Sequence, residues 1–467
     1  MDEPCLTRRV QAPFATETTL HALIPIALRS LRYGLAAILL GVTAPVAVQA
    51  AQTTVRAAFS DSSAFDPNAG GRGGALLLGS DGTLYGTAEF GGTYGLGEIF
   101  SLTPAAGSSG NWTRTSLYSF TGGNDGAYPV GGLVADSAGV LYGATAGDEL
   151  SLANILLPGM NVGQQAGGRV FALVHGSGGY RFSVIANLGV NAVSGRLAID
   201  ANGQLYASVQ HGGGVVNGAV LRLTPTAGTA GAARVAAAWS KATLYQFTNA
   251  ANTKGVSPQG GVVVGADGSV YGSTATGGDM ACHGGTGCGT VFKLTVGAST
   301  PWRLTVLQIF HGGSSGDRPA GPLMVDTSGN LLGVTAFGGH SSTICTQGCG
   351  TVFSVAAKGG LRLLHSFCSA TLSIIKGCSD GFNPTGGLIR HSDGYFYGTT
   401  ALGGSATARA GTVFRLDSYG TFTTVATLSS ATGGEPMPQL AKLSGTQLIG
   451  TTVGNLQTGP QIYALTP

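Results

Sequence analysis

A small set of polar side chains in this sequence could bind an oxygen-rich ligand or transfer protons. Histidine titrates near neutral pH, and beside a carboxylate or an arginine it can bind a sugar or act as a general acid or base. The histidines do not recur in register with the sequence repeat described below, so the repeat does not account for them. We predict ligand binding, with no catalytic role assigned, for His211, His283, His340, His311, Arg318, Asp279 and Glu435.

Three other carboxylates are predicted to have a structural role. The pairs Asp125-Gly126 and Asp380-Gly381, together with Asp317, are interpreted as one position that recurs in different repeats. A residue that the architecture repeats usually serves a turn, and Asp readily accepts hydrogen bonds from its own backbone. We therefore predict that these carboxylates shape loops rather than bind a ligand.

Six cysteines follow the N-terminal region and fall into three close pairs. They are Cys282, Cys288, Cys345, Cys349, Cys368 and Cys378. An even number of cysteines in an exported chain indicates disulfides, and we pair neighbours. The alternative is a zinc site formed by Cys282, His283, Cys288, Cys345 and Cys349, which lie in equivalent loops of adjacent repeats. Their spacings are not those of zinc knuckles, so we predict disulfides, no metal and no other cofactor.

One phrase recurs along the chain and determines the fold class. It consists of a short apolar strand, a glycine turn and a version of Leu-Tyr-Gly-Thr. Its middle residues are Leu84-Tyr85, Leu141-Tyr142, Leu205-Tyr206, Val270-Tyr271, Leu331-Leu332, Phe396-Tyr397 and Leu448-Ile449. The recurring tyrosines occupy one slot of a middle strand, so we predict that they pack between repeats.

Each copy contains four runs typical of strands. In the sixth copy these are Gly387–Arg390, Phe396–Thr399, Gly411–Leu416 and Phe422–Leu428, with a hairpin turn at Asp393-Gly394. Four antiparallel strands repeated seven times predict an all-β, seven-bladed β-propeller. The last copy lacks its fourth strand, and Thr54–Phe59 is predicted to supply it and close the ring. A β-solenoid or a pair of sandwiches is the alternative.

The repeat resembles the Gloeo/Verruco ("GloVer") tandem-repeat proteins of bacteria. The resemblance rests on Leu-Tyr-Gly-Thr, the Gly-Gly loop, Gly-Thr-Val-Phe-x-Leu and Leu-Tyr-x-Phe, and covers nearly all of residues 54–467. It implies an exported protein, since family members carry varied surface anchors. It implies no defined enzymatic activity and no functional residues.

The N-terminal 50 residues are predicted to be a cleaved signal peptide with an over-long start. An apolar run from Leu35 to Val48 ends at Val48-Gln49-Ala50, which suits a signal peptidase, and is too short to span a bilayer. We expect a single domain over residues 51–467, secreted or periplasmic, monomeric and without a membrane span. The net charge of +3, without a basic stripe, argues against nucleic-acid binding.

These observations leave two functional hypotheses. The first is an exported, non-catalytic propeller that binds a glycan or a cell-surface protein. The alternative is a secreted polysaccharide lyase or glycoside hydrolase with its site at the pore mouth. Convergence of the unrepeated polar side chains would favour the second hypothesis.

Overall fold

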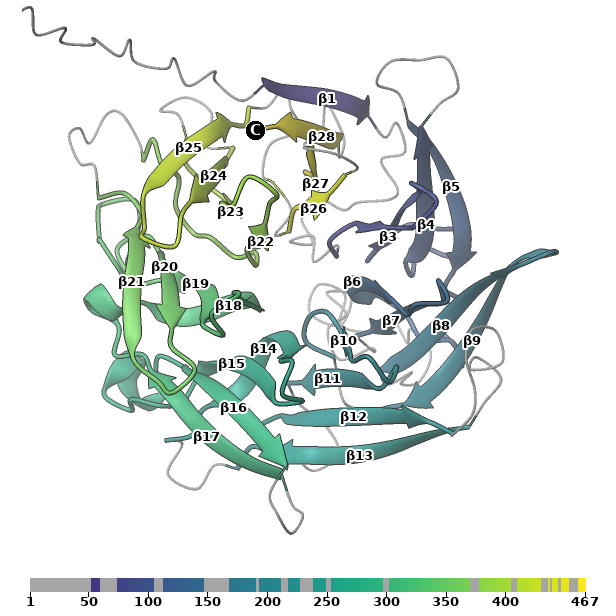
Figure 1. Ribbon diagram of the computed structural model, residues 1–467, viewed down its shortest axis with the longest axis horizontal. Coiled ribbons are helices and arrows are strands. Elements are labelled where there is room, and N and C mark those ends of the chain that lie inside the picture. The colour runs from purple at the N-terminus through teal and green to yellow at the C-terminus, as the bar shows by residue number, and fades with distance from the viewer. Residues whose placement is uncertain are drawn as a thin grey trace, which may run out of the picture. The chain divides into compact units, whose positions relative to one another are not determined.

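The computed structural model contains seven four-stranded antiparallel sheets arranged in a ring (Figure 1). This confirms the predicted all-β, seven-bladed propeller. The structure describes residues 52–58, 74–104, 112–146, 168–189, 193–210, 217–226, 238–248, 253–296, 302–369, 378–404, 410–429, 436, 439–443, 447–452 and 461–467. Among these residues, the helical elements are short 3-10 turns, and no helix is long and apolar enough to cross a membrane.

Each blade is numbered in chain order, and its strands run from the centre of the ring outward. Blade 1 consists of β2 (Leu77–Leu78), β3 (Leu84–Ala88), β4 (Glu98–Pro104) and β5 (Trp112–Ser119). Blade 2 consists of β6 (Pro129–Ala135), β7 (Leu141–Thr145), β8 (Arg169–Gly176) and β9 (Gly179–Asn187). Blade 3 consists of β10 (Ala198–Ile199), β11 (Leu205–Val209), β12 (Ala219–Pro225) and β13 (Trp239–Gln246).

Blades 4 to 6 repeat the same order. Blade 4 consists of β14 (Val256–Val264), β15 (Val270–Thr276), β16 (Thr290–Val296) and β17 (Trp302–Ile309). Blade 5 consists of β18 (Asp317–Val325), β19 (Leu331–Phe337), β20 (Thr351–Val355) and β21 (Leu361–Ser366). Blade 6 consists of β22 (Ile389–Arg390), β23 (Phe396–Thr400), β24 (Thr412–Leu416) and β25 (Phe422–Thr427).

Blade 7 combines the two ends of the propeller. Its sheet order is β26 (Ala441–Lys442), β27 (Leu448–Thr451), β28 (Gln461–Thr466) and then β1 (Gln52–Ala58). The pairing of β1 with β28 is antiparallel, from Gln52 opposite Thr466 to Ala58 opposite Gln461. The prediction that an N-terminal strand closes the ring is therefore confirmed (Figure 1).

Glycine and phenylalanine on neighbouring strands explain why two sequence motifs occur together. Gly272 of β15 lies opposite Phe292 of β16, and a Cβ at Gly272 would lie 2.5 Å from the phenylalanine ring. The missing side chain thus leaves room for the ring to lie across the strand. Blade 3 changes both partners together, because Ala207 lies opposite Leu221. The weak third copy is therefore a matched variant of the same contact.

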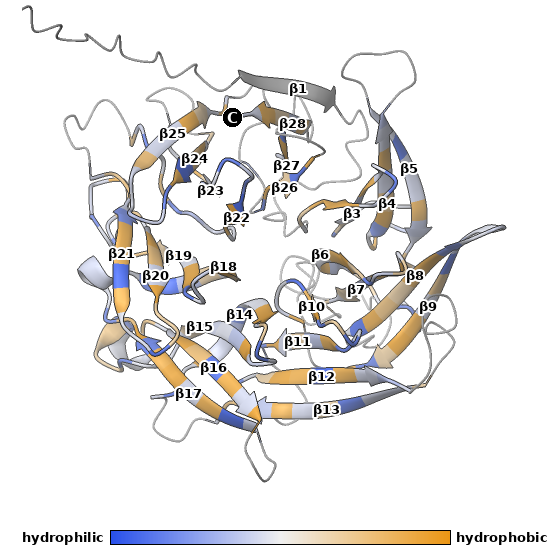
Figure 2. Cartoon of the chain, viewed as in Figure 1, coloured by the Kyte–Doolittle hydropathy of each residue, from blue (hydrophilic) through white to orange (hydrophobic). Residues whose placement is uncertain are grey.

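The recurring tyrosines pack between blades, as predicted. Tyr142 lies in one apolar cluster with Leu205 and Leu221 of the next blade. The hydroxyl of Tyr397 also donates a 2.6 Å hydrogen bond to Asp393 in its own hairpin turn. Burial, together with the charge of Asp200, raises the pKa of Tyr206 to about 12. Figure 2 shows the resulting pattern, with hydrophobic residues concentrated along β12 and hydrophilic residues frequent along the outer strand β13.

Glycines bring the inner parts of adjacent blades into backbone contact. A Cβ added at Gly260 of β14 would lie 2.0 Å from the carbonyl oxygen of Gly321 in β18. Equivalent close approaches join Gly131 to Gly195, and Gly195 to Gly260. These glycines have positive φ angles, which other residues adopt only with strain. The centre of the propeller is therefore held by backbone packing that only glycine permits.

Candidate functional site

Two loops that flank the outer strands of blade 4 meet on one face of the propeller. One loop joins β15 to β16 and contains the 3-10 turn η3 (Cys282–Gly285). The other joins β17 to β18 and contains η4 (Gly313–Ser315). Side chains of these loops and of the start of β18 form two histidine–aspartate contacts, and Arg318 follows one of the aspartates in the chain. We name these residues the blade 4 cluster: Asp279, His283, His311, Asp317 and Arg318.

The contact between His283 and Asp317 is the most enclosed part of this cluster. The distance from Nε2 of His283 to Oδ2 of Asp317 is 2.5 Å. Asp317 is 2 % exposed, whereas the His283 side chain is 24 % exposed. Within the described part of the chain, the second oxygen of Asp317, Oδ1, is buried without a hydrogen-bond partner. A buried carboxylate thus orients a histidine ring that solvent can still reach.

The interpretation of Asp317 as a repeated turn residue is wrong. Asp125 and Asp380 lie four residues before a proline, but Asp317 lies only two residues before Pro319. The residue four before Pro319 is Ser315, and it performs the turn function. Its Oγ accepts a 2.9 Å hydrogen bond from the N–H of His311, as Asp125 accepts one from Thr121 and Asp380 from Cys368.

By the same register, Asp317 occupies a position that is apolar in other blades. Its counterparts are Ala127, Val256 and Phe382. Burial of a carboxylate is costly unless it is paired, and among the described residues no other blade has a buried carboxylate at this place. Asp317 is therefore a feature of blade 5 rather than of the repeat.

A second histidine–aspartate contact lies closer to solvent. Nδ1 of His311 is 2.7 Å from Oδ2 of Asp279, and the His311 side chain is 61 % exposed. The hydrogen bond from His311 holds the pKa of Asp279 below its usual range, with help from the backbone N–H of Ala281. Asp279 is consequently ionised at neutral pH, and it orients His311 at the surface.

Arg318 follows Asp317 in the chain, and hydrogen bonding of its backbone and contact with an aromatic ring hold it in place. Its φ angle of 53° is shared by the residues before other blade-entry prolines, namely Tyr128, Ser257 and Asn383. Its N–H donates a 3.0 Å hydrogen bond to the carbonyl oxygen of Cys288. Its guanidinium lies 5.2 Å from the centre of the Phe337 ring. The backbone conformation of Arg318 thus recurs in other blades, whereas its cationic side chain does not occur at the equivalent positions named above.

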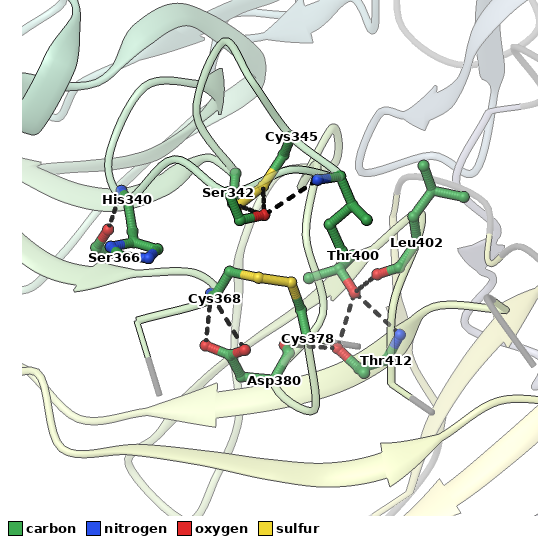
Figure 3. Close-up of a disulfide and its surroundings, with 12 residues drawn as sticks. His340, Ser342, Cys345, Ser366, Cys368, Cys378, Asp380, Thr400, Leu402 and Thr412 are labelled. Atoms are coloured by element: carbon green, nitrogen blue, oxygen red, sulfur yellow. Dashed lines mark hydrogen bonds between the residues drawn. A yellow bond between two sulfur atoms is a disulfide. The ribbon is translucent and has the colours of Figure 1, made fainter. Parts of the chain in front are cut away.

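The predicted disulfides are present as neighbour pairs. They join Cys282 to Cys288, Cys345 to Cys349 and Cys368 to Cys378. Figure 3 shows the bond between Cys368 and Cys378. The first disulfide lies beneath the blade 4 cluster, since a Cβ at Gly312 would be 3.3 Å from the Cys288 sulfur. The alternative zinc site is wrong in the residues that it groups together. Among the described residues, the blade 5 cysteines group with Cys368 and Cys378, not with those of blade 4.

The sequence of these blades matches the model of a known repeat family. The Gloeobacter/Verrucomicrobia repeat matches residues 195–463, which is more than half of the chain. The chain belongs to this family. The match begins in blade 3 and reaches blade 7, so it includes the blade 4 cluster and all three disulfides of this Gloeobacter/Verrucomicrobia repeat protein.

Solved structures are similar to this chain only at low sequence identity. A protein of unknown function from Dyadobacter fermentans is 11 % identical, with a TM-score of 0.42, covering 90 % of this chain and 99 % of its own. An ulvan lyase of polysaccharide lyase family PL25 is 11 % identical, with a TM-score of 0.47, covering 88 % and 95 %. A protein from Lactobacillus plantarum is 11 % identical, with a TM-score of 0.45, covering 75 % and 83 %. No curated protein matches the sequence. At these values the likenesses carry no functional argument.

Of the remaining predicted residues, one lies in the neighbouring loop of blade 5, where the N–H of Gly339 donates a 2.6 Å hydrogen bond to Gly313 in the β17–β18 loop, and two lie outside the described residues. His340 lies in the β19–β20 loop of blade 5, and its N–H donates a 2.8 Å hydrogen bond to Ser366 (Figure 3). His211 and Glu435 lie outside the described residues. A pair that the sequence reasoning missed is His365 and Asp380, with Nε2 3.0 Å from Oδ2. His365 occupies the place of Tyr118, which contacts Asp125 in blade 1. Alignment of the repeats could therefore have predicted that His365 contacts Asp380.

Asp125 provides a test of the repeated turn. It accepts hydrogen bonds from the N–H of Thr121 at 2.8 Å, the hydroxyl of Thr121 at 2.7 Å and the hydroxyl of Tyr118 at 2.9 Å. Burial raises its pKa, but these bonds outweigh burial and leave the pKa below the usual 3.8. We expect Asp125→Ala to lower the free energy of unfolding by about 2 kcal/mol at neutral pH.

The effect of Asp125→Ala should depend on pH in one direction. Because the pKa of Asp125 is lower in the folded state, its carboxylate stabilises the protein above pH 3.8. This stabilisation is lost as the pH falls through the folded-state pKa. Urea unfolding at neutral and acidic pH should therefore show the gap between wild type and Asp125→Ala narrowing below pH 3.8. Asp125→Asn, which keeps an acceptor but no charge, serves as the control. A gap that stays constant into acid would contradict a role for the ionised carboxylate.

Proposed function

We propose that this protein is an exported, non-catalytic propeller that binds a glycan through the blade 4 cluster. The observation that carries the proposal is the departure of this cluster from the repeat. Asp317 replaces an apolar residue, and Ser315 takes over the turn function that Asp performs in other blades. These paired changes maintain the loop while they add a histidine–aspartate contact that the architecture does not need.

The chemistry of the cluster suits sugar hydroxyls. His283 and His311 are each fixed by a carboxylate, and Arg318 is fixed over an aromatic ring. Side chains fixed in this way lose little conformational entropy when they donate hydrogen bonds to a ligand. The net charge of +3 is too small to give strong long-range attraction for a highly anionic polymer, so we propose a neutral or weakly acidic glycan. A cell-surface protein is the other partner that fits an exported propeller.

The test is direct binding of the protein to a panel of immobilised bacterial and algal polysaccharides. We expect retention on at least one glycan without formation of new reducing ends. Failure to bind any glycan, together with capture of a cell-surface protein, would replace the glycan with a protein partner. Expression with the native N-terminus and fractionation of the cells would test export separately.

One observation favours a second function, namely a polysaccharide lyase or hydrolase. The buried Asp317 and the partly exposed His283 form the kind of oriented pair that acts as a general base. New reducing ends, or the ultraviolet absorbance of unsaturated uronates, would establish this alternative. Loss of that product in His283→Ala, with retained glycan binding, would assign the chemistry to this histidine.

Asp317→Val separates a ligand-binding role from a structural role. Valine is the residue that blade 4 has at the same position, so the fold accommodates it. We expect unchanged or slightly higher stability, since a buried carboxylate with one unpartnered oxygen is removed. We expect glycan affinity to fall about tenfold or more, because His283 loses the partner that orients it.

Thermal unfolding and binding isotherms of the same preparations measure both effects of Asp317→Val. His175→Ala is the matched control, since His175 is exposed on β8 of blade 2 and should leave both quantities unchanged. A large loss of stability with normal binding would return Asp317 to a structural role.

A further inference from the structure

Four sulfur atoms of blade 5 and of its connection to blade 6 lie within 4.8 Å of one another. They belong to Cys345, Cys349, Cys368 and Cys378, which we name the four-sulfur cluster. Figure 3 labels Cys345, Cys368 and Cys378. Cys349, Cys368 and Cys378 are buried, and Cys345 is half-buried. This places two disulfides in contact inside the protein.

Disulfide chemistry does not account for this contact. Cys345 and Cys349 are joined within the β19–β20 loop, and Cys368 and Cys378 within the β21–β22 connection. Neither bond links the two loops, so neither requires the other to be near.

Comparison with other blades shows that the fold does not require four cysteines either. The place of Cys349 is filled by Leu96 in blade 1, by Cys288 in blade 4 and by Ala410 in blade 6. Blade 4 has a single loop disulfide, and the place of Cys368 is taken there by His311. The second cysteine pair of blade 5 is thus an addition to an already complete loop arrangement.

We propose that the four-sulfur cluster is a tetrathiolate metal site, with zinc as its best-fitting ion, whose oxidised form is the observed pair of disulfides. Four thiolates are a complete tetrahedral ligand set for zinc, and bonds of about 2.3 Å place the sulfurs about 3.8 Å apart. The observed limit of 4.8 Å is close enough for small side-chain rotations to reach this arrangement. Such a site joins the two loops, as the disulfides do not.

The conversion needs a reductant and releases protons. Two equivalents of a dithiol reduce the two disulfides with four electrons and four protons, giving four thiols and two oxidised reductant molecules. Binding of one zinc ion to four thiolates then displaces the four thiol protons into solvent. Two molecules of an external disulfide reverse the process, because they accept four electrons from the thiolates and four protons from solvent, the two protein disulfides form again and the ion is released.

Hydrogen bonds that do not involve sulfur hold the two loops in place in either form. The N–H of Cys349 donates to the carbonyl oxygen of His340 at 2.8 Å, and the N–H of Cys368 donates to Asp380 at 3.0 Å. In addition, the hydroxyl of Ser342 lies 3.1 Å from the sulfur of Cys345, to which it donates. Donors of this last kind stabilise and orient thiolate ligands at metal sites.

The test uses the full chain in a Cys282→Ser/Cys288→Ser background. This background removes the blade 4 disulfide and with it the group formed by His283, Cys288 and Asp317, so the four-sulfur cluster is the only cysteine group left among the described residues. The protein is reduced anaerobically, freed of reductant and titrated with Co²⁺ and then Zn²⁺. We expect one ion per chain, with the charge-transfer and visible bands of tetrahedral cobalt thiolate, and with displacement by zinc.

Further variants make the outcome decisive. Cys368→Ser/Cys378→Ser should lose the cobalt bands, and Ser342→Ala should weaken metal binding about tenfold. Near-ultraviolet circular dichroism confirms that each reduced variant is folded, and zinc should raise the thermal midpoint only where all four cysteines are present. A folded, reduced protein that lacks the cobalt thiolate bands would overturn the proposal. Equal binding by the variant without Cys368 and Cys378 would do the same.

Discussion

Replacement of Gly260 by alanine is expected to lower the free energy of unfolding by about 3 kcal/mol or more. The added Cβ would lie 2.0 Å from the carbonyl oxygen of Gly321, and the φ angle of +77° is itself unfavourable for alanine. Backbone of the neighbouring blade cannot move aside as a flexible side chain would, so the two inner strands must separate. Equilibrium unfolding in urea measures the loss.

The matched control for Gly260→Ala is Gly329→Ala. Gly329 has a similar φ angle of +81°, but a Cβ there would meet nothing within 4 Å. It should cost only the backbone strain, about 1 kcal/mol. The difference between the two variants isolates the contact between blades. Equal losses would show that the glycines serve backbone conformation alone.

Removal of β1 is expected to have the second large effect. A chain that begins at residue 59 lacks the strand that pairs with β28 from Gln461 to Thr466. The outer edge of blade 7 then loses its hydrogen-bond partners, and the ring is no longer closed between its two ends. We expect the thermal midpoint to fall by at least about 5 °C, with association of chains through the free edge.

A chain that begins at Ala51 is the control for the removal of β1. It retains Gln52–Ala58 and should unfold at the same temperature as the full chain, as judged by calorimetry and size-exclusion chromatography. Addition of a synthetic peptide with the β1 sequence should restore part of the lost stability. If both truncations behave like the full chain, β1 does not close the ring in solution.

Local sequence features are sufficient to predict the blades, because their contacts are repeated. The pair of Gly272 and Phe292 recurs as a glycine opposite a phenylalanine in four other blades, so the order of the strands follows from the sequence although the intervening loop varies in length. The disulfides are predictable for a similar reason, since each joins cysteines no more than ten residues apart.

The candidate site is less predictable, because it depends on contacts across loops. His283 and Asp317 are 34 residues apart, and no spacing rule joins them. The turn prediction for Asp317 is wrong because an aspartate near a glycine resembles the turn aspartates, and only its distance from Pro319 distinguishes it from them. The meeting of Cys349 with Cys378 depends on how two loops fold over one another, which the pairing of neighbours does not reveal.

The backbone contact between inner strands also limits how the family can diversify. Where Gly131, Gly195 and Gly260 meet their neighbours, there is no room for a side chain, so mutation cannot place new chemistry there. Selection for a new ligand must therefore act on the loops at the ends of the blades, where Asp317 and the extra cysteines of blade 5 arose. We expect sequences of relatives to vary least at these inner glycines and most in the β15–β16 and β19–β20 loops. The inner strands would then identify members of the family, and the loops would distinguish their ligands.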